Sequence, residues 1–519
     1  MSAYFDLARD EFEDVAEPGC VVALHRELDV DLAPLDAYTA LRDGHAFLLE
    51  SAEKHVSAFR EVDGDGGAGD RARYSFVGFE PDAVVEIDGR AVDVERLRDD
   101  AAATLRSRRT ETAEADDALD GLRGALPDVE PRNFRSEGRQ VFTGGLVGVL
   151  GYDVVHDVWL DGAGSRSTAP DAVYVVSTRN LTFDHDADAV TLVFTPVVDG
   201  ETDSLEVYDA CVEAGRRAED RLEAYDSRSS QPFVVHDERA GDRDSYVDAV
   251  ETARDHVYDG DVYQAVVSRK RAYDVEGDPR DYYEALRDVN PSPYMYLLEY
   301  GDHAVVGSSP ETLVSVHGDR VTTNPIAGTC GRGATPVEDR RLAGEMLSDE
   351  KELAEHVMLV DLGRNDVRRV SQPGSVEVED FMSVVQYSHV QHIESTVVGV
   401  LAEDGRAYDA FDATRAVFPA GTLSGAPKIR AMEIVDELEA EPRGFYGGGV
   451  GYYSWTGDAD LAIAIRTAAF ERTGERRYDM EVQAGAGVVY DSRPEREYRE
   501  TEDKMDALKT ALELAREGR

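Results

Sequence analysis

Two pairs of glutamates, each pair three residues apart, lie in segments far from each other along the chain. Glu352 and Glu355 belong to DEKELAEHVMLVDLGRND, and Glu497 and Glu500 belong to PEREYRETEDK near the end. Residues three apart share one face of a helix, so each pair would present two carboxylates together. Four such carboxylates could share one Mg²⁺, which prefers oxygen ligands and keeps positions for water and substrate. Each pair taken alone is also typical of a solvated acidic helix face, because the chain holds 106 acidic residues.

Other residues with chemical potential surround these pairs. A glycine-rich turn, Ala327 to Gly333, precedes the first pair and could hold an anion beside the cation. Arg466 ends an apolar run, where a cation is costly unless an anion pairs with it; a bound carboxylate and an internal ion pair explain it equally well. His392 lies in a strand-like segment. It could transfer a proton in a reaction, or it could be a hydrogen-bonded core residue. Together these features indicate a Mg²⁺-assisted enzyme acting on a small carboxylate-bearing anion.

The charge balance of the chain is strongly acidic. It has 55 Lys and Arg against 106 Asp and Glu, a net charge of -51, and lysine occurs only at positions 54, 270, 351, 428, 504 and 509. Self-repulsion of this size destabilises a fold in dilute salt, whereas molar salt screens it to about 3 Å. The composition resembles that of cytosolic proteins from salt-accumulating halophiles. It argues against binding to nucleic acid or to anionic membranes, which both require basic patches.

Cysteine content and the chain start bear on the compartment. Cys20, Cys211 and Cys330 are far apart and fit no metal-ligand spacing, which indicates a reducing compartment. The N-terminus has no apolar signal core, and no apolar run approaches the roughly 20 residues of a membrane helix. We therefore expect a cytoplasmic protein without a membrane association.

Helices and strands alternate along the chain without a regular βαβ rhythm. This favours an α+β sandwich over a doubly wound sheet. The stretch 227–244 is polar and contains Pro and Gly, so it predicts a boundary that divides the chain into 1–235 and 236–519. Two stretches, 142–148 and 445–451, both fit F-x-G-G-x-V-G. The match is consistent with two related sheet halves, and equally with glycines that let backbones approach closely in a packed sheet.

Several longer motifs occur in a fixed order between about 245 and 505. They are PIAGT, DEKELAEHVMLVDLGRND, GTLSGAPK, GGGVGY, AIRT, QAGAG and the terminal E-x-x-E. This series resembles the large, chorismate-binding subunits of anthranilate synthases, among the chorismate-utilising enzymes. The first 230 residues match through LLES at 48–51 and FTGGLVGVLGYD from 142. The resemblance implies a large α/β sandwich around stacked, mainly antiparallel β-sheets.

The resemblance also implies roles for individual residues. Mg²⁺ would lie between the two acidic helices and bind the ring carboxylate of chorismate, held by Glu355 and Glu500 with Glu352 and Glu497 in support. Substrate contacts are implied for Gly328, Thr329, Tyr452, Arg466, Gly485, Ala486, Gly487 and Lys504. The catalytic residues would be Glu311, His392 and Thr422. Glu311 could protonate the leaving hydroxyl, and His392 would handle a proton in the second half of the reaction. Thr422 would line the pocket.

Two positions distinguish the nucleophiles used within this family. Relatives that add water carry a lysine base where this chain has Gln264, and aminodeoxychorismate synthases have a lysine in P-I-K-G-T where this chain has Ala327. The nucleophile should therefore be external ammonia attacking C2 of chorismate, which gives anthranilate and pyruvate. The alternative is component I of an aminodeoxychorismate synthase, in which ammonia attacks C4. A catalytically idle tryptophan-binding subunit is disfavoured by the complete set of acids with Arg466 and Lys504.

Partners and regulation follow from the same resemblance. The ammonia would come from a separate glutamine amidotransferase subunit in a hetero-oligomer, a heterotetramer, since none of the three cysteines lies in a nucleophile elbow. Glu50, Ser51 and the run Pro293, Tyr294, Met295 match the pocket that binds tryptophan as a feedback inhibitor of the first step of tryptophan biosynthesis. Cys330 and Gly331 replace a frequent Arg-Pro, and we expect no change of chemistry from this.

Overall fold

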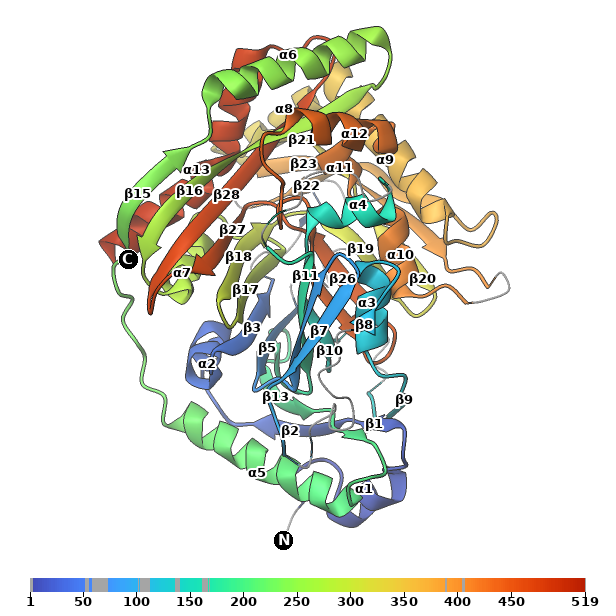
Figure 1. Cartoon of the computed structure of the whole chain (residues 1–519), viewed down its shortest axis with the longest axis vertical. Helices are drawn as coiled ribbons and strands as arrows, with labels where there is room; N and C mark the ends of the chain where they lie inside the picture. Colours follow the sequence, from blue (N-terminus) through green and yellow to red (C-terminus); the bar gives the residue numbers. More distant parts are fainter. Residues whose placement is uncertain are drawn as a thin grey trace.

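Two large antiparallel β-sheets form the centre of the protein, as the computed structural model shows (Figure 1). The structure describes residues 3–51, 56–57, 73–100, 102, 113–135, 141–160, 167, 169–387, 390–403 and 407–518. Within these residues one sheet has 12 strands, with β24 (Gly425–Ala426) beside β16 and the others in the following order. They are β15 (Val234–Ala240), β16 (Gln264–Glu276), β28 (Arg477–Val488), β27 (Thr467–Arg472), β18 (His303–Ser309), β17 (Tyr294–Tyr300), β3 (His45–Glu50), β5 (Tyr74–Phe79), β12 (Arg179–Asp184), β13 (Ala189–Phe194) and β2 (Leu24–Leu28).

The second large sheet has 13 strands within the described residues, with β21 (Ile326–Gly331) paired to β23 off the main path. Its order is β4 (Val56–Ser57), β22 (Glu377–Gln386), β23 (Val390–Val400), β20 (Arg320–Thr323), β19 (Thr312–His317), β26 (Ala459–Ile463), β25 (Gly449–Ser454), β10 (Gly145–Leu150), β11 (Ala172–Ser177), β6 (Ala83–Asp88), β7 (Ala91–Arg96) and β8 (Ala113–Glu114). A small sheet joins β14 (Val197–Val198), β1 (Cys20–Val22) and β9 (Glu130–Arg132). Both large sheets take strands from both sides of residue 235.

Helices cover the outer faces of the two sheets. Their bounds are α1 (Arg9–Val15), α2 (Pro34–Leu41), α3 (Ala118–Ala125), α4 (Val155–Val158), α5 (Ser204–Glu223), α6 (Arg243–Asp259), α7 (Pro279–Val289), α8 (Pro336–Met346), α9 (Glu350–Arg368), α10 (Ala410–Val417), α11 (Gly421–Ser424), α12 (Lys428–Leu438) and α13 (Pro494–Glu517). Helices α2, α5, α7 and α13 bury apolar side chains against the 12-stranded sheet, and α3, α9 and α10 do so against the 13-stranded sheet. The predicted α+β sandwich of stacked antiparallel sheets is confirmed.

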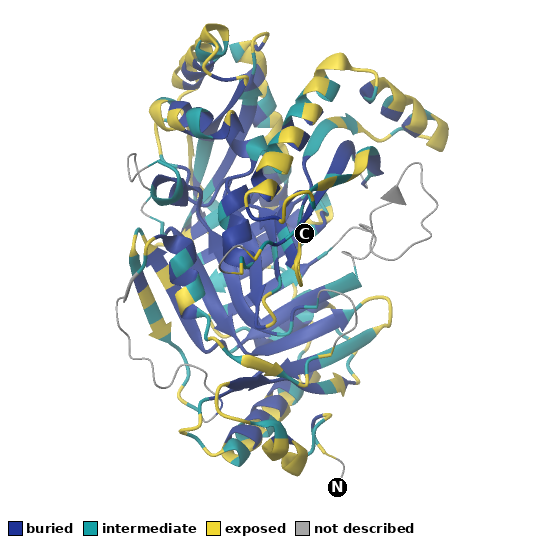
Figure 2. Ribbon diagram, turned by 90° about the vertical axis from the view of Figure 1, so that its right-hand side faces the viewer, coloured by how far each residue is buried: buried dark blue, intermediate teal, exposed yellow. Residues whose placement is uncertain are grey.

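An apolar layer fills the space between the sheets. It joins Phe47 and Phe76 of the 12-stranded sheet to Val147 and Val173 of the other sheet. Successive side chains of a strand point to opposite faces, so the alternate residues of the same strands face the outer helices. Buried residues are therefore concentrated in the strands, and exposed ones along the outer helices (Figure 2).

The two glycine-rich repeats pair directly with each other. Strands β10 and β25 are antiparallel neighbours, with Gly148 opposite Gly451. A Cβ on Gly148 would lie 2.0 Å from the carbonyl oxygen of Val173, and one on Gly451 would lie 2.0 Å from that of Asp460. Close backbone approach thus accounts for these glycines.

The glycine-rich stretch before the acidic helix is mostly a strand, not the expected turn. Strand β21 pairs with β23, and its register shifts between Ala327 and Thr329. The residue at the shift, Gly328, has φ +61°, a conformation that glycine adopts without steric cost.

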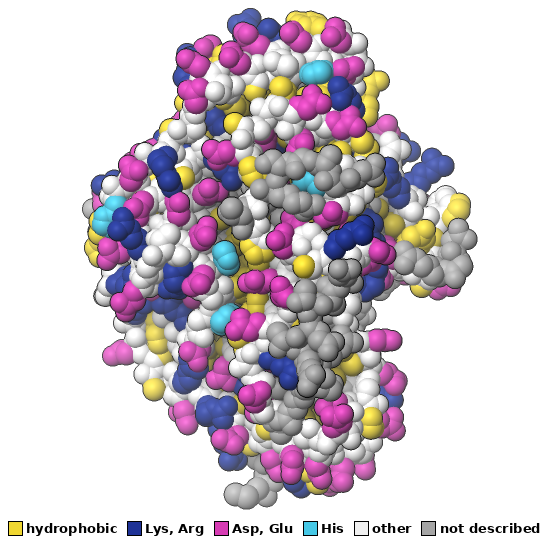
Figure 3. Space-filling view, in the orientation of Figure 1, with side chains coloured by type: hydrophobic (Ala, Val, Ile, Leu, Met, Phe, Trp, Pro, Cys, Tyr) yellow, Lys and Arg dark blue, Asp and Glu magenta, His cyan; other side chains and the backbone are white. Residues whose placement is uncertain are grey.

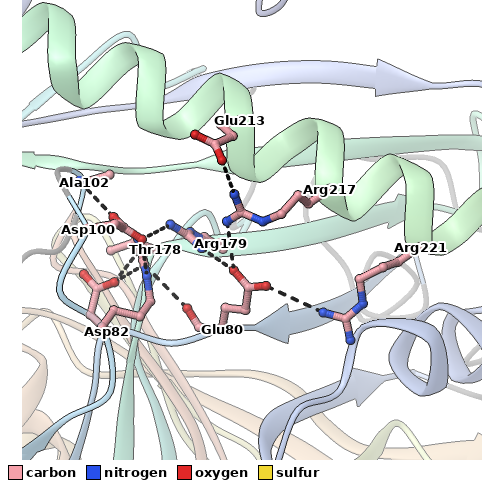
Figure 4. Close-up of polar contacts among 10 residues, drawn as sticks. Glu80, Asp82, Asp100, Ala102, Thr178, Arg179, Glu213, Arg217 and Arg221 are labelled. Atoms are coloured by element: carbon pink, nitrogen blue, oxygen red, sulfur yellow. Dashed lines mark hydrogen bonds and ion pairs between the residues drawn. The ribbon is translucent and has the colours of Figure 1, made fainter.

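Acidic side chains are scattered over the face shown in Figure 3, but some carboxylates lie inside the protein and are paired there. Arg98 forms an ion pair with Asp82, and both side chains are nearly inaccessible. Arg179 of β12 pairs with Glu80 and, at 2.7 Å, with Asp100. Arginines of α5 reach Glu80 from the other side, so this network joins α5 to the sheet (Figure 4).

We expect the Arg98→Met substitution to lower the free energy of unfolding by about 3 kcal/mol, because it leaves the Asp82 carboxylate buried without its cation. The matched control is Arg9→Met, which removes an exposed pair with Asp209 and should cost less than about 1 kcal/mol. Urea unfolding of both variants at one salt concentration measures the difference. Equal losses would contradict this account of the network.

Candidate active site

The glutamates of the two acidic helices α9 and α13 lie close enough for their charges to interact. The Asp349 side chain caps α9 by accepting from the backbone N–H groups of Lys351 (2.9 Å) and Glu352 (3.4 Å). Burial raises the pKa of Glu352, and the carboxylates of Glu355 and, across the gap, Glu500 raise it further. The negative charge of Glu500 on α13 thus acts on Glu352 of α9.

The second pair behaves in the same way. Burial and the Glu500 carboxylate raise the pKa of Glu497. Lys504 lies 2.9 Å from Glu500 and also donates to the carbonyl oxygen of Gly485 at 2.9 Å. In the described part of the chain, no group of three or more His, Cys, Asp or Glu side chains is arranged to hold a metal ion.

The start of β16 and the end of β28 lie next to these helices. The Gln264 side-chain amide donates to Glu355 at 2.8 Å, so this residue is tied to the acidic pair. Gly487 pairs with Val266 on the neighbouring strand, and a Cβ there would lie 2.5 Å from the Gln264 amide nitrogen. The glycine thus leaves the space that Gln264 occupies, and the buried Ala486 precedes it.

The structure places Tyr446, rather than Tyr452, at this strand. A Cβ on Gly485 would lie 3.0 Å from the Tyr446 hydroxyl oxygen. Tyr452 lies in the apolar layer between the sheets, with its ring centroid 4.8 Å from that of Phe142. Tyr446 occupies the variable second position of the glycine-rich repeat, directly before three glycines, and it was not singled out from the sequence.

Glu311 and Arg466 both lie where the chain passes from one large sheet to the other. Glu311 stands between β18 and β19, and Arg466 between β26 and β27. The two crossings are bonded to each other, since Ile463 N–H donates to the Glu311 carbonyl at 3.0 Å and Ser308 N–H to the Arg466 carbonyl at 3.1 Å. Arg466 has φ +50°, a left-handed conformation that is rare for a residue with a side chain.

The Glu311 carboxyl group is buried and holds its proton at neutral pH. Burial raises its pKa to about 8, although the Ile326 N–H, the Thr422 hydroxyl and the Arg466 charge each act to lower it. Thr422 Oγ1 lies 3.2 and 3.3 Å from the two carboxyl oxygens. A buried carboxylic acid of this kind can donate a proton.

His392 faces Arg466 and the Gly328 bulge. Its Nδ1 lies 2.9 Å from Thr329 Oγ1 and 3.2 Å from the Gly328 carbonyl oxygen. Burial lowers its pKa to about 4, helped by the Arg466 charge, so the ring is neutral. We assign the proton to Nδ1, which can donate to Gly328. Nε2 is buried without a hydrogen-bond partner among the described residues, and it is then free to accept a proton.

The residues matched to an inhibitor pocket lie together at one end of β3 and β17. Glu50 pairs with Met295 in the sheet, and Ser51 follows directly. The Glu50 carboxylate already accepts from Tyr283 at 2.8 Å and from Arg287 at 2.8 and 2.9 Å. It therefore anchors α7.

Tyr294, in the same group, connects to the second sheet. Its hydroxyl lies 2.8 Å from Thr312 Oγ1 and 3.1 Å from Asp460. Pro293 before it is buried, and the Ser51 hydroxyl is buried without a hydrogen-bond partner among the described residues.

A family model described as chorismate binding enzyme matches residues 68–510. This chain belongs to that family. It is 55% identical over 523 residues to an anthranilate synthase component 1 of Halobacterium salinarum, covering 98% of this chain and 97% of that protein. It is 56% identical over 526 residues to another from Haloarcula marismortui, covering 98% and 96%. The predicted resemblance, including the halophilic composition, is confirmed.

Solved structures agree with the fold. Anthranilate synthase component I from Streptococcus pneumoniae aligns with a TM-score of 0.70 at 34% identity, covering 92% of this chain and 97% of that one. The isochorismate synthase MenF from Escherichia coli aligns with a TM-score of 0.68 at 17% identity, which bears on the fold alone. Among the described residues, no helix is long and apolar enough to cross a membrane.

The raised pKa of Glu311 has a consequence for stability. A carboxyl whose pKa is about 8 when folded and about 4.5 when unfolded contributes stability fully below pH 4.5, and loses it as the pH rises to 8. Glu311→Gln keeps the neutral group, so this chorismate binding enzyme should become more stable at pH 8 by a few kcal/mol and about equally stable at pH 4.5. Urea unfolding at both pH values tests this. A variant that is less stable at pH 8 would contradict the burial of a neutral acid.

Proposed function

We propose that this protein is the large subunit of an anthranilate synthase and converts chorismate and ammonia into anthranilate and pyruvate. The observation that carries the proposal concerns Gln264. This residue has no basic amine, and its side-chain amide donates a hydrogen bond to Glu355. Ala327, at the position where aminodeoxychorismate synthases have a lysine, likewise offers no amine. The nucleophile must then come from outside, and the names of the 55% and 56% identical relatives support ammonia.

We assign a divalent cation to the space between the glutamates of α9 and α13. Burial and the carboxylates of Glu355 and Glu500 raise the pKa of Glu352, and burial and Glu500 raise that of Glu497. A hard cation with oxygen ligands would relieve this repulsion. We assign Glu355 and Glu500 as Mg²⁺ ligands, with Glu352 and Glu497 in support. When bound, Mg²⁺ would polarise the ring carboxylate of chorismate as a Lewis acid.

Substrate binding uses the cations and backbone groups around these helices. Arg466 and Lys504 suit the enolpyruvyl carboxylate, since both supply positive charge in a strongly negative protein. The strand from Gly485 to Gly487, which has little or no side chain, lets the substrate approach the backbone, with the Tyr446 hydroxyl beside it. Gly328 and Thr329 close the opposite side next to His392.

The reaction follows from the protonation states of two buried groups. Ammonia forms a bond to C2 while both ring double bonds shift by one position and the C4–O bond breaks. Glu311 gives its proton to the departing hydroxyl, which leaves as water, and the new ammonium group on C2 loses one proton to solvent. In the second half, His392 accepts the C2 proton at Nε2 and the C3–O bond breaks, releasing the enolate of pyruvate, which takes a proton from solvent to become pyruvate. The aromatic product is anthranilate. Thr422 holds the Glu311 carboxyl throughout.

The test is incubation with chorismate, Mg²⁺ and ammonium in molar KCl, followed by anthranilate fluorescence. Fluorescent product formed without a lyase supports the proposal. A nonfluorescent aminated product that needs a lyase to aromatise would identify an aminodeoxychorismate synthase instead. Tryptophan binding without any turnover would identify a regulatory subunit.

The metal assignment predicts a loss of function that stability does not explain. Glu355→Ala and Glu500→Ala should each abolish turnover, by about 1,000-fold or more, because each removes a ligand that orients the substrate carboxylate. Glu513→Ala, an exposed residue farther along α13, is the matched control and should retain activity. Measurements over a range of Mg²⁺ concentrations check this. Near-normal activity in either site variant would remove the assignment.

Partner and regulation complete the proposal. Ammonia is mostly protonated at neutral pH, so a separate glutamine amidotransferase would deliver it, within a cytoplasmic heterotetramer. Tryptophan would bind beside Ser51 and the run from Pro293 to Met295, where the Ser51 hydroxyl is available as a hydrogen-bonding group.

Replacing Ser51 by alanine should weaken inhibition by tryptophan about tenfold and leave uninhibited turnover unchanged, since one hydrogen bond to a charged ligand is lost. Ser375→Ala, a serine in a turn before β22, serves as the control. Inhibition curves at fixed chorismate measure the effect. An unchanged half-inhibitory concentration for the Ser51 variant would defeat the assignment.

A further inference from the structure

A buried ion pair joins three helices behind Glu311. Lys428 Nζ lies 2.7 Å from Asp366 Oδ2 and donates to the Val417 carbonyl oxygen at 2.6 Å. Lys428 is the first residue of α12, Asp366 lies in the last turn of α9, and Val417 ends α10. The last carbonyls of a helix lack partners within it and favour a nearby cation, so one ammonium group fixes all three helix ends.

The pair also fixes both ends of the segment that carries Thr422. This segment runs from Phe418 to Pro427, between the Val417 carbonyl and Lys428 itself. Along it, the Trp159 indole donates to the Phe418 carbonyl at 2.8 Å, and β24 pairs with β16 at Gln264. Thr422 stands in the middle, with its hydroxyl on Glu311.

Packing leaves little freedom between this segment and α9. Asp366, Thr422 and Glu311 line one small cavity, together with Leu362 and Gly363 of α9. A Cβ on Gly421 would lie 2.2 Å from Leu362 Cδ2, so α11 rests on α9 at contact distance. A shift of α9 relative to α12 would therefore move Thr422 relative to Glu311.

We propose that Asp366 and Lys428 are positioning residues for the acid of the reaction, because they hold the Thr422 hydroxyl on the Glu311 carboxyl group. This inference rests on the proposed function, in which Glu311 protonates the leaving hydroxyl. The pair touches neither substrate nor reacting atoms in this scheme, and its effect passes through Thr422.

The inference has a signature that a merely structural pair would lack. The Thr422 hydroxyl donates to Glu311 and lowers its pKa, as do the Ile326 N–H and Arg466, whereas burial and Glu394 of β23 raise it. Loss of the Thr422 contact should therefore raise the Glu311 pKa and move the alkaline limb of the kcat profile to higher pH. Transfer of the proton becomes harder at the same time, so kcat falls.

The experiment compares Lys428→Met, Asp366→Asn and Thr422→Val with the double variant Lys428→Met/Thr422→Val. Each single variant should lower kcat about tenfold with the KM for chorismate within twofold, and each should shift the alkaline limb upward. The double variant should match Thr422→Val alone, because both changes remove one contact. Lys428→Arg should recover part of the activity. Lys270→Met, which removes a lysine paired with Glu481 on β28, is the matched control and should leave the pH profile unchanged.

The inference would be overturned if the losses in kcat of the two single variants multiplied in the double variant. It would also be overturned if the alkaline limb of the kcat profile did not move. Because removing one partner of a buried pair is strongly destabilising, Asp366→Leu/Lys428→Met provides a second variant without an unpaired charge. It should fold and still show the upward shift, and a folded variant with the parental profile also overturns the inference. Retained activity in Glu311→Gln would refute the acid role itself. Loss of activity there, with no shift in the Lys428 variants, would refute the positioning role alone.

Discussion

Repulsion between carboxylates of α9 and α13 is the constraint on which the site depends. Two features allow the fold to hold these charges close. Glu352 and Glu497 lie in the first turns of their helices, where the helix dipole favours negative charge. The opposite faces are apolar: α13 buries Met505, Leu508 and Leu512 against the 12-stranded sheet. Each such side chain contributes about 1.5–3 kcal/mol, so packing on one face stabilises what repulsion opposes on the other.

The remaining site residues depend on the places where the chain passes between the two sheets. Glu311 and Arg466 lie at two such crossings, which are hydrogen-bonded to each other. A crossing residue is flanked by strands of both sheets, and the Glu311 side chain is buried there, whereas Arg466 is partly exposed. This explains why Glu311 keeps a proton at neutral pH and why the strained backbone of Arg466 is maintained. Glu311 and Arg466 thus share one rigid frame.

The sequence was sufficient for the fold class, the family and the two helices that carry the acidic pairs, because i, i+3 spacing and motif order are local properties. It was insufficient where strand register or burial determines the surroundings of a side chain. Tyr446 and Tyr452 lie at opposite ends of the same run of glycines and Val450, and the pairing of β25 with β10 and β26 turns Tyr452 into the apolar layer. Likewise, the stretch 227–244 reads as a polar linker, yet it contains β15, which pairs with β16. The protonation state of Glu311 depends on burial by segments remote in sequence.

The few lysines of the chain show how such a site works in a strongly acidic protein. Every lysine in the described residues is paired with a carboxylate, although arginine supplies most positive charge elsewhere. Lys504 and Lys428 each serve a carboxylate and a backbone carbonyl at once. A compact ammonium with three donors can do this where a planar guanidinium would need more room. Salt screens exposed charges far more than buried ones, so a salt concentration that relieves surface repulsion leaves the Lys428 pair nearly unaffected. A salt concentration that stabilises the acidic surface therefore leaves the buried ion pair of Lys428 and Asp366 in place.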